Sequence, residues 1–310
     1  DYQRPAAPVS DHWPVTAATA GPGAASPTWQ EFIADDRLRQ LVALALDNNR
    51  DLRVAALNIE KARAQYRIQG AELFPAIAAG VDNSNSRASA DLSGSSSQIT
   101  RSITADIGFS SYELDLFGRL RSLNAQAQQS FLATVETRRT TRISLIAEVA
   151  SAWLTLGADQ ELLRLAEDTL KSRQDSHDLI ARSAELGVAS HLTLAQARTA
   201  VETARADVAS YTSQVARDRN ALTVLAGREV PADLLPAALP GQVASLRELP
   251  AGVPSEVLQQ RPDILAAEHR LQAANANIGA ARAAFLPSIT LTADIGSASS
   301  QLSGLFESGT

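Results

Sequence analysis

The fold is decided by the stretch Arg119–Glu185, which reads RLRSLNAQAQQSFLATVETRRTTRISLIAEVASAWLTLGADQELLRLAEDTLKSRQDSHDLIARSAE. It contains no proline and one glycine, Gly157, so nothing in it stops a helix firmly. At a rise of about 1.5 Å per residue, a continuous helix of this length extends over roughly 100 Å, about three times the diameter of a small domain. A helix this long needs a partner along its length.

After a short break at Leu186–Ser190, the chain returns in a second helical run with a heptad pattern. Its seam positions are apolar or aromatic except for Asp218, and they are Leu194, Ala197, Val201, Ala204, Val208, Tyr211, Val215, Asp218, Leu222 and Leu225. The outgoing run keeps the register at Ile143, Ile146, Ala150 and Trp153. Farther along, Arg173 and His177 interrupt it. The pattern predicts a coiled-coil hairpin, although an ordinary antiparallel hairpin in a soluble bundle fits the same periodicity.

Composition narrows the classes of partner. The 310 residues are 45% hydrophobic and carry a formal net charge of −6 without any block of basic residues, so a nucleic-acid partner is not expected. There is no cysteine and no apolar run long enough for a membrane-spanning helix. Any membrane span would therefore have to be made of strands.

Two short segments have the period of β-strands. Ile77, Ala79 and Val81 alternate with small or polar residues, and so do Ile103, Ala105, Ile107 and Phe109. The residues between them, Asp82–Gln98, have the composition of a loop. Alternation over about ten residues is enough to cross a bilayer when the strand is tilted. The edge hairpin of a soluble sheet is the alternative that alternation leaves open.

An internal repeat with an offset of 212 residues organises the chain. The first copy is marked by Asp51, Pro75 and Ile77, and it recurs as Asp263, Pro287 and Ile289. Each copy predicts a short helix, a break, a longer helix, a proline and a strand. The longer helix of the first copy and the returning helical run of the hairpin, placed end to end, together have about the length of the long run Arg119–Glu185.

These patterns predict nine consecutive parts. They are an extended arm at 1–35, an equatorial short helix at 36–50, a longer helix at 51–74, a strand hairpin at 75–110 with an outer loop at 82–98, a long helical hairpin at 111–227 with its tip at 186–190, an equatorial link with a short helix at 228–261, a repeat of the longer helix at 262–286, a strand at 287–296 and the start of a second outer loop at 297–310.

Four segments, spread over essentially the whole chain, give it a family resemblance. They are DYQRPAAP at Asp1–Pro8, YELDLFGRLRS at Tyr112–Ser122, GVASHLTL at Gly187–Leu194, and RPDILAAEHRL with IGAARAAFLPSITL within Arg261–Leu291. The chain resembles the outer-membrane efflux channels of the TolC and OprM type, particularly their lipoprotein branch. The resemblance implies a mixed α and β membrane protein: a homotrimer in which each protomer adds four strands to one β-barrel, three of them present here, and helical hairpins to one periplasmic coiled-coil tunnel.

The chain departs from the resembling proteins in two ways. Those proteins continue well beyond Thr310 through a fourth strand and a second long hairpin, so the chain corresponds to roughly two thirds of such a protein, and no gate residues are assigned. In the lipoprotein branch an acylated cysteine lies a few residues before the DYQRP-like segment. A lipid anchor on a cysteine upstream of Asp1 is therefore an inference about the precursor.

Residues with a candidate role lie at the hairpin tip and at the helix-to-strand junctions. Gly187 is suited to end a helix in the left-handed conformation, and Ser190 or Thr193 can cap the next helix. The resemblance implies that a periplasmic adaptor, or membrane fusion protein, docks on this tip, and the residues that we assign to it are Leu186, Gly187, Val188 and Ala189. Pro75 and Pro287 mark the junctions.

No catalytic, cofactor or metal site is expected. The four histidines are not spaced as ligand pairs with nearby carboxylates, and the sequence has neither a phosphate-binding glycine loop nor a nucleophile elbow. The leading interpretation is a passive outer-membrane duct of a tripartite multidrug pump, supplied by an inner-membrane transporter of the RND type. The alternative is a soluble coiled-coil scaffold or a periplasmic adaptor.

Overall fold

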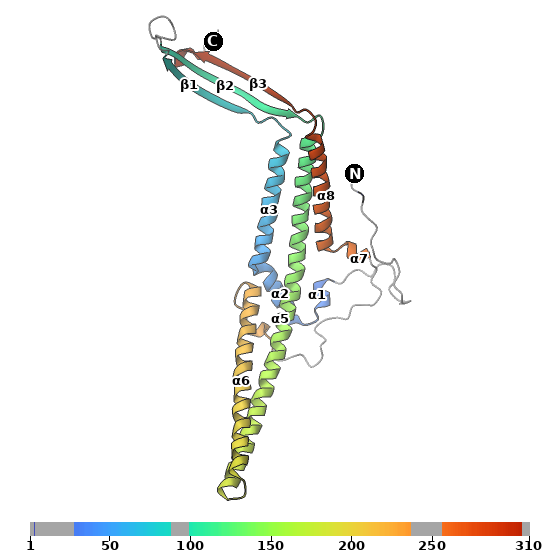
Figure 1. Cartoon of the computed structure of the whole chain (residues 1–310), viewed down its shortest axis with the longest axis vertical. Helices are drawn as coiled ribbons and strands as arrows, with labels where there is room; N and C mark the ends of the chain where they lie inside the picture. The colour runs from blue at the N-terminus through green and yellow to red at the C-terminus, as the bar shows by residue number, and fades with distance from the viewer. Residues whose placement is uncertain (1–2, 4–27, 88–98, 237–255, 306–310) are drawn as a thin grey trace. The chain divides into compact units, whose positions relative to one another are not determined.

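A computed structural model describes residue 3 and residues 28–87, 99–236 and 256–305 (Figure 1). The chain divides into two compact units. The first, called the sheet unit, contains Ile59–Thr134 and Ala266–Thr310, and the second, called the hairpin unit, contains Ala6–Asn58 and Val135–Leu265. Apart from residue 3, the described residues leave out 1–27 of the arm, 88–98 of the outer loop, 237–255 of the equatorial link and the last residues, 306–310.

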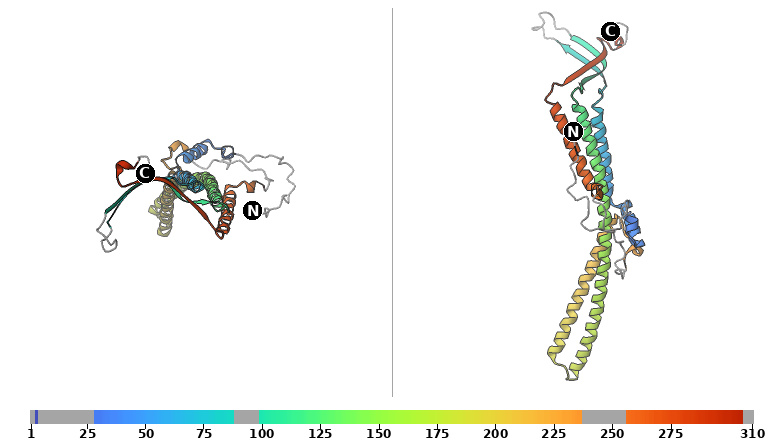
Figure 2. Two further views of the ribbon diagram at one scale, coloured as in Figure 1. Left: turned by 90° about the horizontal axis from the view of Figure 1, so that it is seen from above. Right: turned by 90° about the vertical axis from the view of Figure 1, so that its right-hand side faces the viewer.

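The hairpin unit is built on two antiparallel helices. Helix α5, Arg119–Glu185, forms one unbroken helix of 67 residues whose second part belongs to this unit, and α6, His191–Ala226, returns beside it (Figure 2). Short elements complete the unit: α1 Trp29–Phe32, α2 Asp36–Asn48, the 3-10 turn η1 Ala232–Leu234 and α7 Glu256–Gln259. Because α5 contains no proline and only one glycine, nothing in its sequence forces it to bend into two helices.

The core of the hairpin unit lies where α2 and η1 pack on the hairpin. Trp153 is fully buried, and its Nε1 donates a hydrogen bond of 2.9 Å to the carbonyl oxygen of Leu234. The fully buried residues of α2 are Leu38, Leu41, Val42 and Ala45. Asp35 caps α2, because its side chain accepts hydrogen bonds from the backbone N–H groups of Arg37 and Leu38. The short equatorial helix therefore closes a compact apolar cluster.

The predicted seam of α6 is observed. All ten heptad positions are buried or half-buried, with Val201, Ala204, Val215 and Leu222 buried most completely. On α5 the prediction was partly wrong, because Ile143 is 55% exposed, whereas Leu145 and Val149 are buried. Burial at 145, 149, 153 and 156 follows the helical period of 3.6 rather than a strict heptad, because this part of α5 packs on α2 as well as on α6.

The end of α6 meets the start of α3, Arg50–Ala71. Asn49 donates from its amide nitrogen to the carbonyl oxygen of Leu225 at 2.9 Å and accepts from the N–H of Leu52, so one buried side chain joins the two helix ends. Gly227 has φ 73° and a Cβ there would lie 2.3 Å from the carbonyl oxygen of Asn48, so only glycine fits. The end-to-end stacking of these two helices agrees with the sequence prediction.

The sheet unit holds parts of three helices and one antiparallel sheet. Helix α8, Pro262–Ala283, contacts the first part of α5, where His269 Nδ1 lies 2.7 Å from Gln129 Oε1 and a Cβ on Gly279 would lie 3.1 Å from the Ser122 hydroxyl. On another side of α5, the rings of Tyr66 and Phe131 stack with centroids 6.4 Å apart. Small residues on α8 permit this close approach.

The strands are β1 Ala78–Arg87, β2 Ile99–Leu114 and β3 Ile289–Ser299, in the order β1-β2-β3 (Figure 1). The short 3-10 turn η2, Leu302–Gly304, follows β3. All three predicted strands are present and lie side by side, but they are longer than the sequence indicated. Residues 82–87 belong to β1 and not to the predicted outer loop, and residues 297–299 belong to β3 and not to the second loop. Ladder pairing with β2 overrides the loop-like composition of the first of these segments.

Candidate functional site

The register of the sheet separates an apolar face from a polar face. Ile107 of β2 pairs with Ala79 of β1 and with Ile295 of β3, so these three side chains lie on one face of the sheet. Every second residue along each strand lies on the same face. The apolar face carries Ala79, Val81, Ile103, Ala105, Ile107, Phe109, Tyr112, Leu114, Ile289, Leu291, Ala293 and Ile295. Toward the other end of the ladder the same face continues into the polar residues Asn83, Asn85, Ser297 and Ser299. A register shift between Phe109 and Tyr112 keeps Tyr112 and Leu114 on this face, and Ser111 takes φ 59° there.

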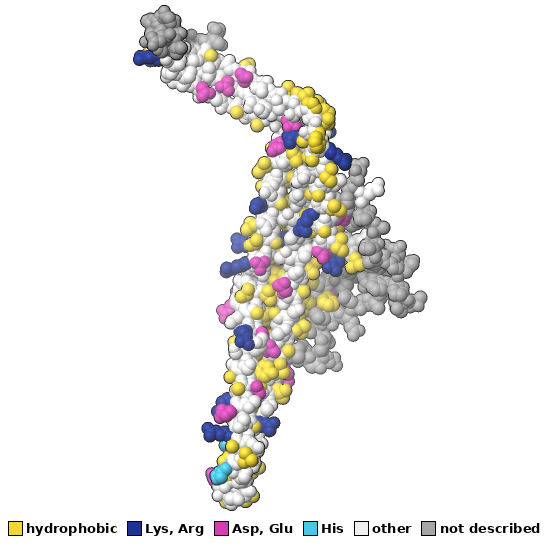
Figure 3. Space-filling view, viewed as in Figure 1, with side chains coloured by type: hydrophobic (Ala, Val, Ile, Leu, Met, Phe, Trp, Pro, Cys, Tyr) yellow, Lys and Arg dark blue, Asp and Glu magenta, His cyan; other side chains and the backbone are white. Residues whose placement is uncertain are grey.

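The opposite face is polar and acidic. It carries Ser, Thr and Gly residues together with Asp82, Asp106 and Asp294, and Figure 3 shows acidic side chains along the sheet. Two glycines on this face are required by close packing, because a Cβ on Gly108 would lie 2.4 Å from the carbonyl oxygen of Ala293 and one on Gly296 would lie 2.6 Å from that of Ala105. One face of the sheet thus suits lipid and the other suits water.

The two copies of the repeat end their helices in the same way. In the first, the N–H groups of Leu73 and Phe74 donate to the carbonyl oxygens of Gly70 and Ala71, so the last turn tightens before Pro75. In the second, Phe285 and Leu286 donate to Arg282 and Ala283 before Pro287, which is the same pattern displaced by 212 residues. Pro75 and Pro287 thus lie between helix and strand in both copies.

A third junction joins β2 to α5, and Asp115 organises it. Its carboxylate accepts hydrogen bonds from the backbone N–H groups of Leu120 at 3.1 Å and Arg121 at 3.0 Å, and it forms an ion pair with the Arg121 side chain. Burial opposes ionisation of this carboxyl, but the hydrogen bonds outweigh burial and lower the pKa of Asp115. Arg119 pairs beside it with Glu113, Nε to Oε1 at 2.8 Å.

The tip residues form a compact turn between α5 and α6. Gly187 has φ 75° and its N–H donates to the carbonyl oxygen of Ala184, while the N–H of Val188 donates to that of Ser183. Ser190 caps α6 by accepting from the N–H of Thr193 at 3.1 Å. Leu186 is 80% exposed and Val188 is 81% exposed, so the turn presents two aliphatic side chains to its surroundings.

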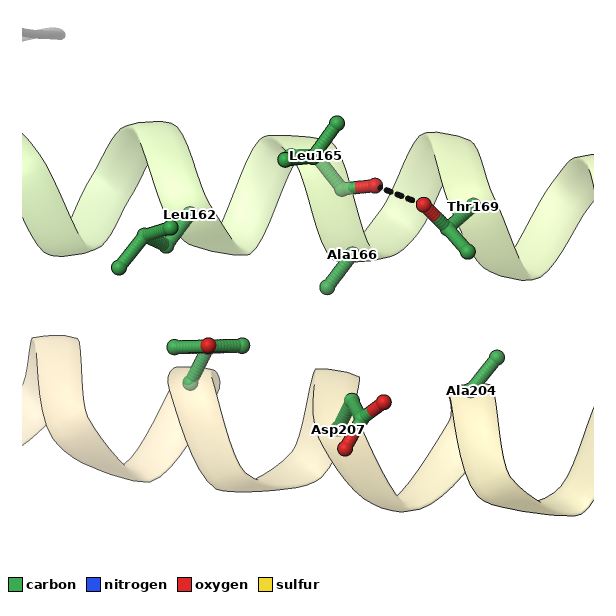
Figure 4. A pocket seen from close by; sticks show the side chains of 7 residues that line it. Leu162, Leu165, Ala166, Thr169, Ala204 and Asp207 are labelled. Atoms are coloured by element: carbon green, nitrogen blue, oxygen red, sulfur yellow. Dashed lines mark hydrogen bonds between the residues drawn. The ribbon is translucent and has the colours of Figure 1, made fainter.

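An open groove of about 220 Å³ lies between the two helices of the hairpin (Figure 4). Its lining residues are Leu162, Leu165, Ala166 and Thr169 from α5 and Ala204, Asp207 and Tyr211 from α6. The Thr169 hydroxyl donates to the carbonyl oxygen of Leu165, so it is already bonded.

Asp218, the polar residue of the seam, lies near Asp159 of α5. Burial and the neighbouring Asp159 carboxylate raise the pKa of Asp218, although Gln214 donates to the Asp218 carboxylate at 3.0 Å. Within the described ranges, the structure contains no cluster of three His, Cys, Asp or Glu side chains arranged for a metal ion. Over the same ranges, no helix is both long and apolar enough to pass through a membrane.

Comparison with known proteins identifies the family. The model of the outer membrane efflux protein family matches residues 41–228 and 253–310. The chain belongs to the outer membrane efflux protein family. The match includes the hairpin, the tip and all three strands described here. Membership assigns the chain to the outer membrane.

Relatives and solved structures agree with this assignment. The antibiotic efflux pump outer membrane protein ArpC of Pseudomonas putida is 52% identical over 100% of this chain and 65% of its own length. A membrane protein from Pseudomonas aeruginosa has a crystal structure that matches with a TM-score of 0.87 and 44% identity, covering 100% of this chain and 70% of the other. The open-state outer membrane channel MtrE of Neisseria gonorrhoeae matches with a TM-score of 0.82 and 40% identity, covering 100% and 68%.

The chain spans about 65% of the length of the curated relatives that it matches. It is a mostly helical family member with a partial sheet of three strands. The turn at 186–190 and the prolines between helix and strand are present, while the docking role of the turn stays a prediction. Sequence reasoning missed the Asp115 cap and the acidic face. The Asp115 cap has a local signal, because an Asp stands a few residues ahead of an uninterrupted helix. The acidic face depends on the register between strands that are far apart in the sequence.

Proposed function

We propose that this chain is the major part of an outer membrane channel subunit in a tripartite efflux pump. The sheet carries the proposal: one face is apolar, the other is polar, and its outer strands β1 and β3 each have a partner on one side among the described strands. Unpaired strand edges are not tolerated in lipid, so the sheet requires further strands. A homotrimer with a shared barrel, continued by a tunnel of coiled-coil helices, supplies them.

In this proposal the protein is a passive conduit and not an enzyme. Antibiotics and other small molecules would leave along the polar face of the sheet, because that face tolerates water. A periplasmic adaptor would contact Leu186, Gly187, Val188 and Ala189, and an inner-membrane pump of the RND type would supply the energy. The two exposed aliphatic side chains of the tip support the adaptor contact, since exposed apolar groups gathered at a turn favour association. A lipid anchor would be attached to a cysteine upstream of Asp1.

Planar-bilayer conductance tests the channel. The full-length protein should produce stable conductance steps, and the 310-residue chain alone should produce none, because its sheet leaves strand edges open. A full-length protein that remains in solution without detergent and conducts nothing would contradict the proposal.

The tip is tested by Gly187→Glu in the full-length protein. Nothing lies within 4 Å of a Cβ built on Gly187, so the added side chain meets no atom of its own chain, and its charge should block an apolar contact with the adaptor. We expect drug export to be abolished while the yield of trimer is unchanged. Gly187→Asn is the matched control, because asparagine tolerates a positive φ and adds no charge. Unchanged export with Gly187→Glu would remove the tip from the docking surface.

A further inference from the structure

The charged residues of the sheet are divided between its two faces according to their sign. Arg87 of β1 and Arg101 of β2 lie on the same face as Ile107. None of the described strand residues on that face is acidic. The acidic residues of the described strands all lie on the opposite, polar face, and they are Asp82, Asp106, Glu113 and Asp294. The face that carries the arginines therefore favours an anionic occupant around them.

Both arginines lie at the end of the sheet that is remote from the helices. Arg101 pairs with Asn85, and Arg87 pairs with Ile99, so the two arginines are diagonal neighbours on adjacent strands. Diagonal neighbours on one face of an antiparallel pair are roughly 7–8 Å apart, which is within reach of long side chains. Figure 3 shows a basic side chain at this end of the sheet. Two guanidinium groups can thus approach one anionic headgroup.

Neither guanidinium group is used within the described part of the chain. Arg87 and Arg101 are exposed, and neither forms an ion pair or a side-chain hydrogen bond with a described residue. The arginines at the helix end of β2, by contrast, each pair with a carboxylate. Asn83 and Asn85 are exposed on the same face and offer amide donors and acceptors beside the cations.

The place of the arginines along the strands corresponds to the surface of a bilayer. From Leu114 to Ile103, at about 3.3 Å per residue, β2 extends over roughly 36 Å. At a tilt of about 45° this rises by roughly 25 Å, which is the height of the apolar band on membrane barrels. Arg101 comes two residues after this stretch, about 5 Å farther at the same tilt. Because the helices continue into the periplasm in the proposed function, the arginines lie at the outer leaflet.

A phosphate-bearing lipid fits this end of the sheet better than a neighbouring copy of the chain. A copy offers the same basic end, whereas its strand carboxylates lie on the other face. Arg101 is also on the central strand β2, which has a strand on each side. Guanidinium groups bind phosphate through paired, charge-assisted hydrogen bonds. The outer leaflet of an outer membrane consists of lipopolysaccharide, a glycolipid whose lipid A part carries phosphates on its sugars.

We propose that Arg87 and Arg101 bind the lipid A phosphates of lipopolysaccharide in the outer leaflet, while Asn83 and Asn85 bond to its sugar and amide groups. This inference rests on the proposed function, because it requires the sheet to cross the outer membrane with its helices on the periplasmic side. The contact ties the outer end of the sheet to the leaflet that surrounds it.

Binding of lipid A to the full-length protein tests the inference. Bisphosphorylated lipid A is titrated into the detergent-solubilised trimer, and the bound fraction is measured by native mass spectrometry. The variants are Arg87→Gln, Arg101→Gln and the two together. The matched control combines Arg138→Gln with Arg142→Gln, at two exposed arginines of α5 in the hairpin unit. Lipid A without its phosphates and inorganic phosphate are the two further probes.

We expect each single substitution to weaken binding about fivefold and the double substitution roughly 30-fold, as for two arginines near an anionic lipid surface. The control should bind like the wild type. Lipid A without phosphates should bind the wild type as weakly as intact lipid A binds the double variant. Millimolar inorganic phosphate should not compete, because acyl chains hold the lipid phosphates at the arginines. Arg87→Lys with Arg101→Lys should retain most of the binding, since the charges remain, and this rescue excludes misfolding as the cause of the loss.

Equal affinity of the wild type and the double glutamine variant for lipid A would overturn the inference. Tight binding of lipid A without phosphates would do so too, and competition by inorganic phosphate would indicate a site for a free anion instead. A double variant that loses the trimer but keeps its affinity for lipid A would assign the arginines to a contact between copies and would also refute the lipid site.

Conductance of the wild-type, full-length protein separates this inference from the proposed function. If that protein gives stable conductance steps while the double variant binds lipid A as tightly as the wild type, the sheet crosses the membrane and only the lipid site is refuted. If the wild type conducts nothing and remains in solution without detergent, both proposals fail together.

Discussion

The core of the hairpin unit and the sheet of the sheet unit use apolar residues in opposite ways. Around Trp153, apolar side chains from α2, α5 and α6 bury one another almost completely. In the sheet, Ile107 is 52% exposed, Val81 is 71% exposed and Ile295 is 76% exposed. The first region supplies its own apolar environment. The second has a regular ladder of hydrogen bonds but needs lipid or protein from outside to cover its apolar face.

The two regions therefore differ in what stabilises them: burial within the chain in one, and an apolar environment around the chain in the other. The core around Trp153 should resist unfolding without a membrane, because its burial depends only on residues of the same chain. The sheet should gain stability only where its surroundings are apolar. Substitutions in the two regions should therefore respond differently to transfer from detergent to a bilayer.

The largest effect is expected for Trp153→Ala. It empties a fully buried position and leaves the carbonyl oxygen of Leu234 without its donor, and such substitutions cost about 3–5 kcal/mol. Urea unfolding followed by circular dichroism would measure the loss in detergent and in lipid, and the value should be similar in both. Leu192→Ala, at a position 69% exposed, is the control and should change little. A loss that appears only in lipid would contradict the contrast.

The next effect is expected for Ile107→Arg, which places a charge on the apolar face. In lipid this should cost about 2–4 kcal/mol, as for an arginine near the middle of a bilayer, whereas in water it should be nearly neutral. Folding into vesicles of the full-length protein would measure it. Thr104→Arg, on the polar face of the same strand, is the matched control. Equal losses of folding free energy from the two variants would show that both faces of the sheet lie in the same environment.

A smaller effect is expected for Asp115→Ala at the junction between β2 and α5. Loss of the cap should cost about 1 kcal/mol. Because the folded pKa of Asp115 is lowered, its contribution is present above the unfolded pKa of about 4 and is lost as the pH falls through the folded pKa. Unfolding free energies from neutral to acid pH should therefore converge for wild type and variant. A constant difference across this range would rule out the carboxylate as the cause.

The smallest effect, and of opposite sign, is expected for Asp218→Asn. The folded pKa of Asp218 is raised, so the native state binds the proton more tightly than the unfolded state, and stability falls as the pH rises through that range. Removing the charge should stabilise the hairpin by about 0.2–0.5 kcal/mol at neutral pH, the size of a like-charge pair. The gain should vanish in acid. Asp207→Asn, at an exposed position that lines the open groove of the hairpin, is the control.

Much of the hairpin could be predicted because its signal is local. The heptad positions of α6 from Leu194 to Leu225 are buried or half-buried, and Gly187 takes the left-handed conformation that its position suggested. Ile143 was misplaced because α5 packs on α2 as well as on α6, and a pairwise seam takes no account of a third helix. The docking role of the tip stays a prediction, because its evidence would lie in a partner.

The sequence by itself determined where α5 can run unbroken, where prolines end the helices of the two repeats, and which residues alternate in the strands. These properties depend on backbone sterics and on neighbours a few residues apart. Only the tertiary structure decided that 82–87 extends β1 and that Asp82, Asp106 and Asp294 share a face. It also decided that the three junctions between helix and strand lie at one end of the sheet. Strand register and helix packing join residues nearly two hundred positions apart, and no local propensity encodes such pairings.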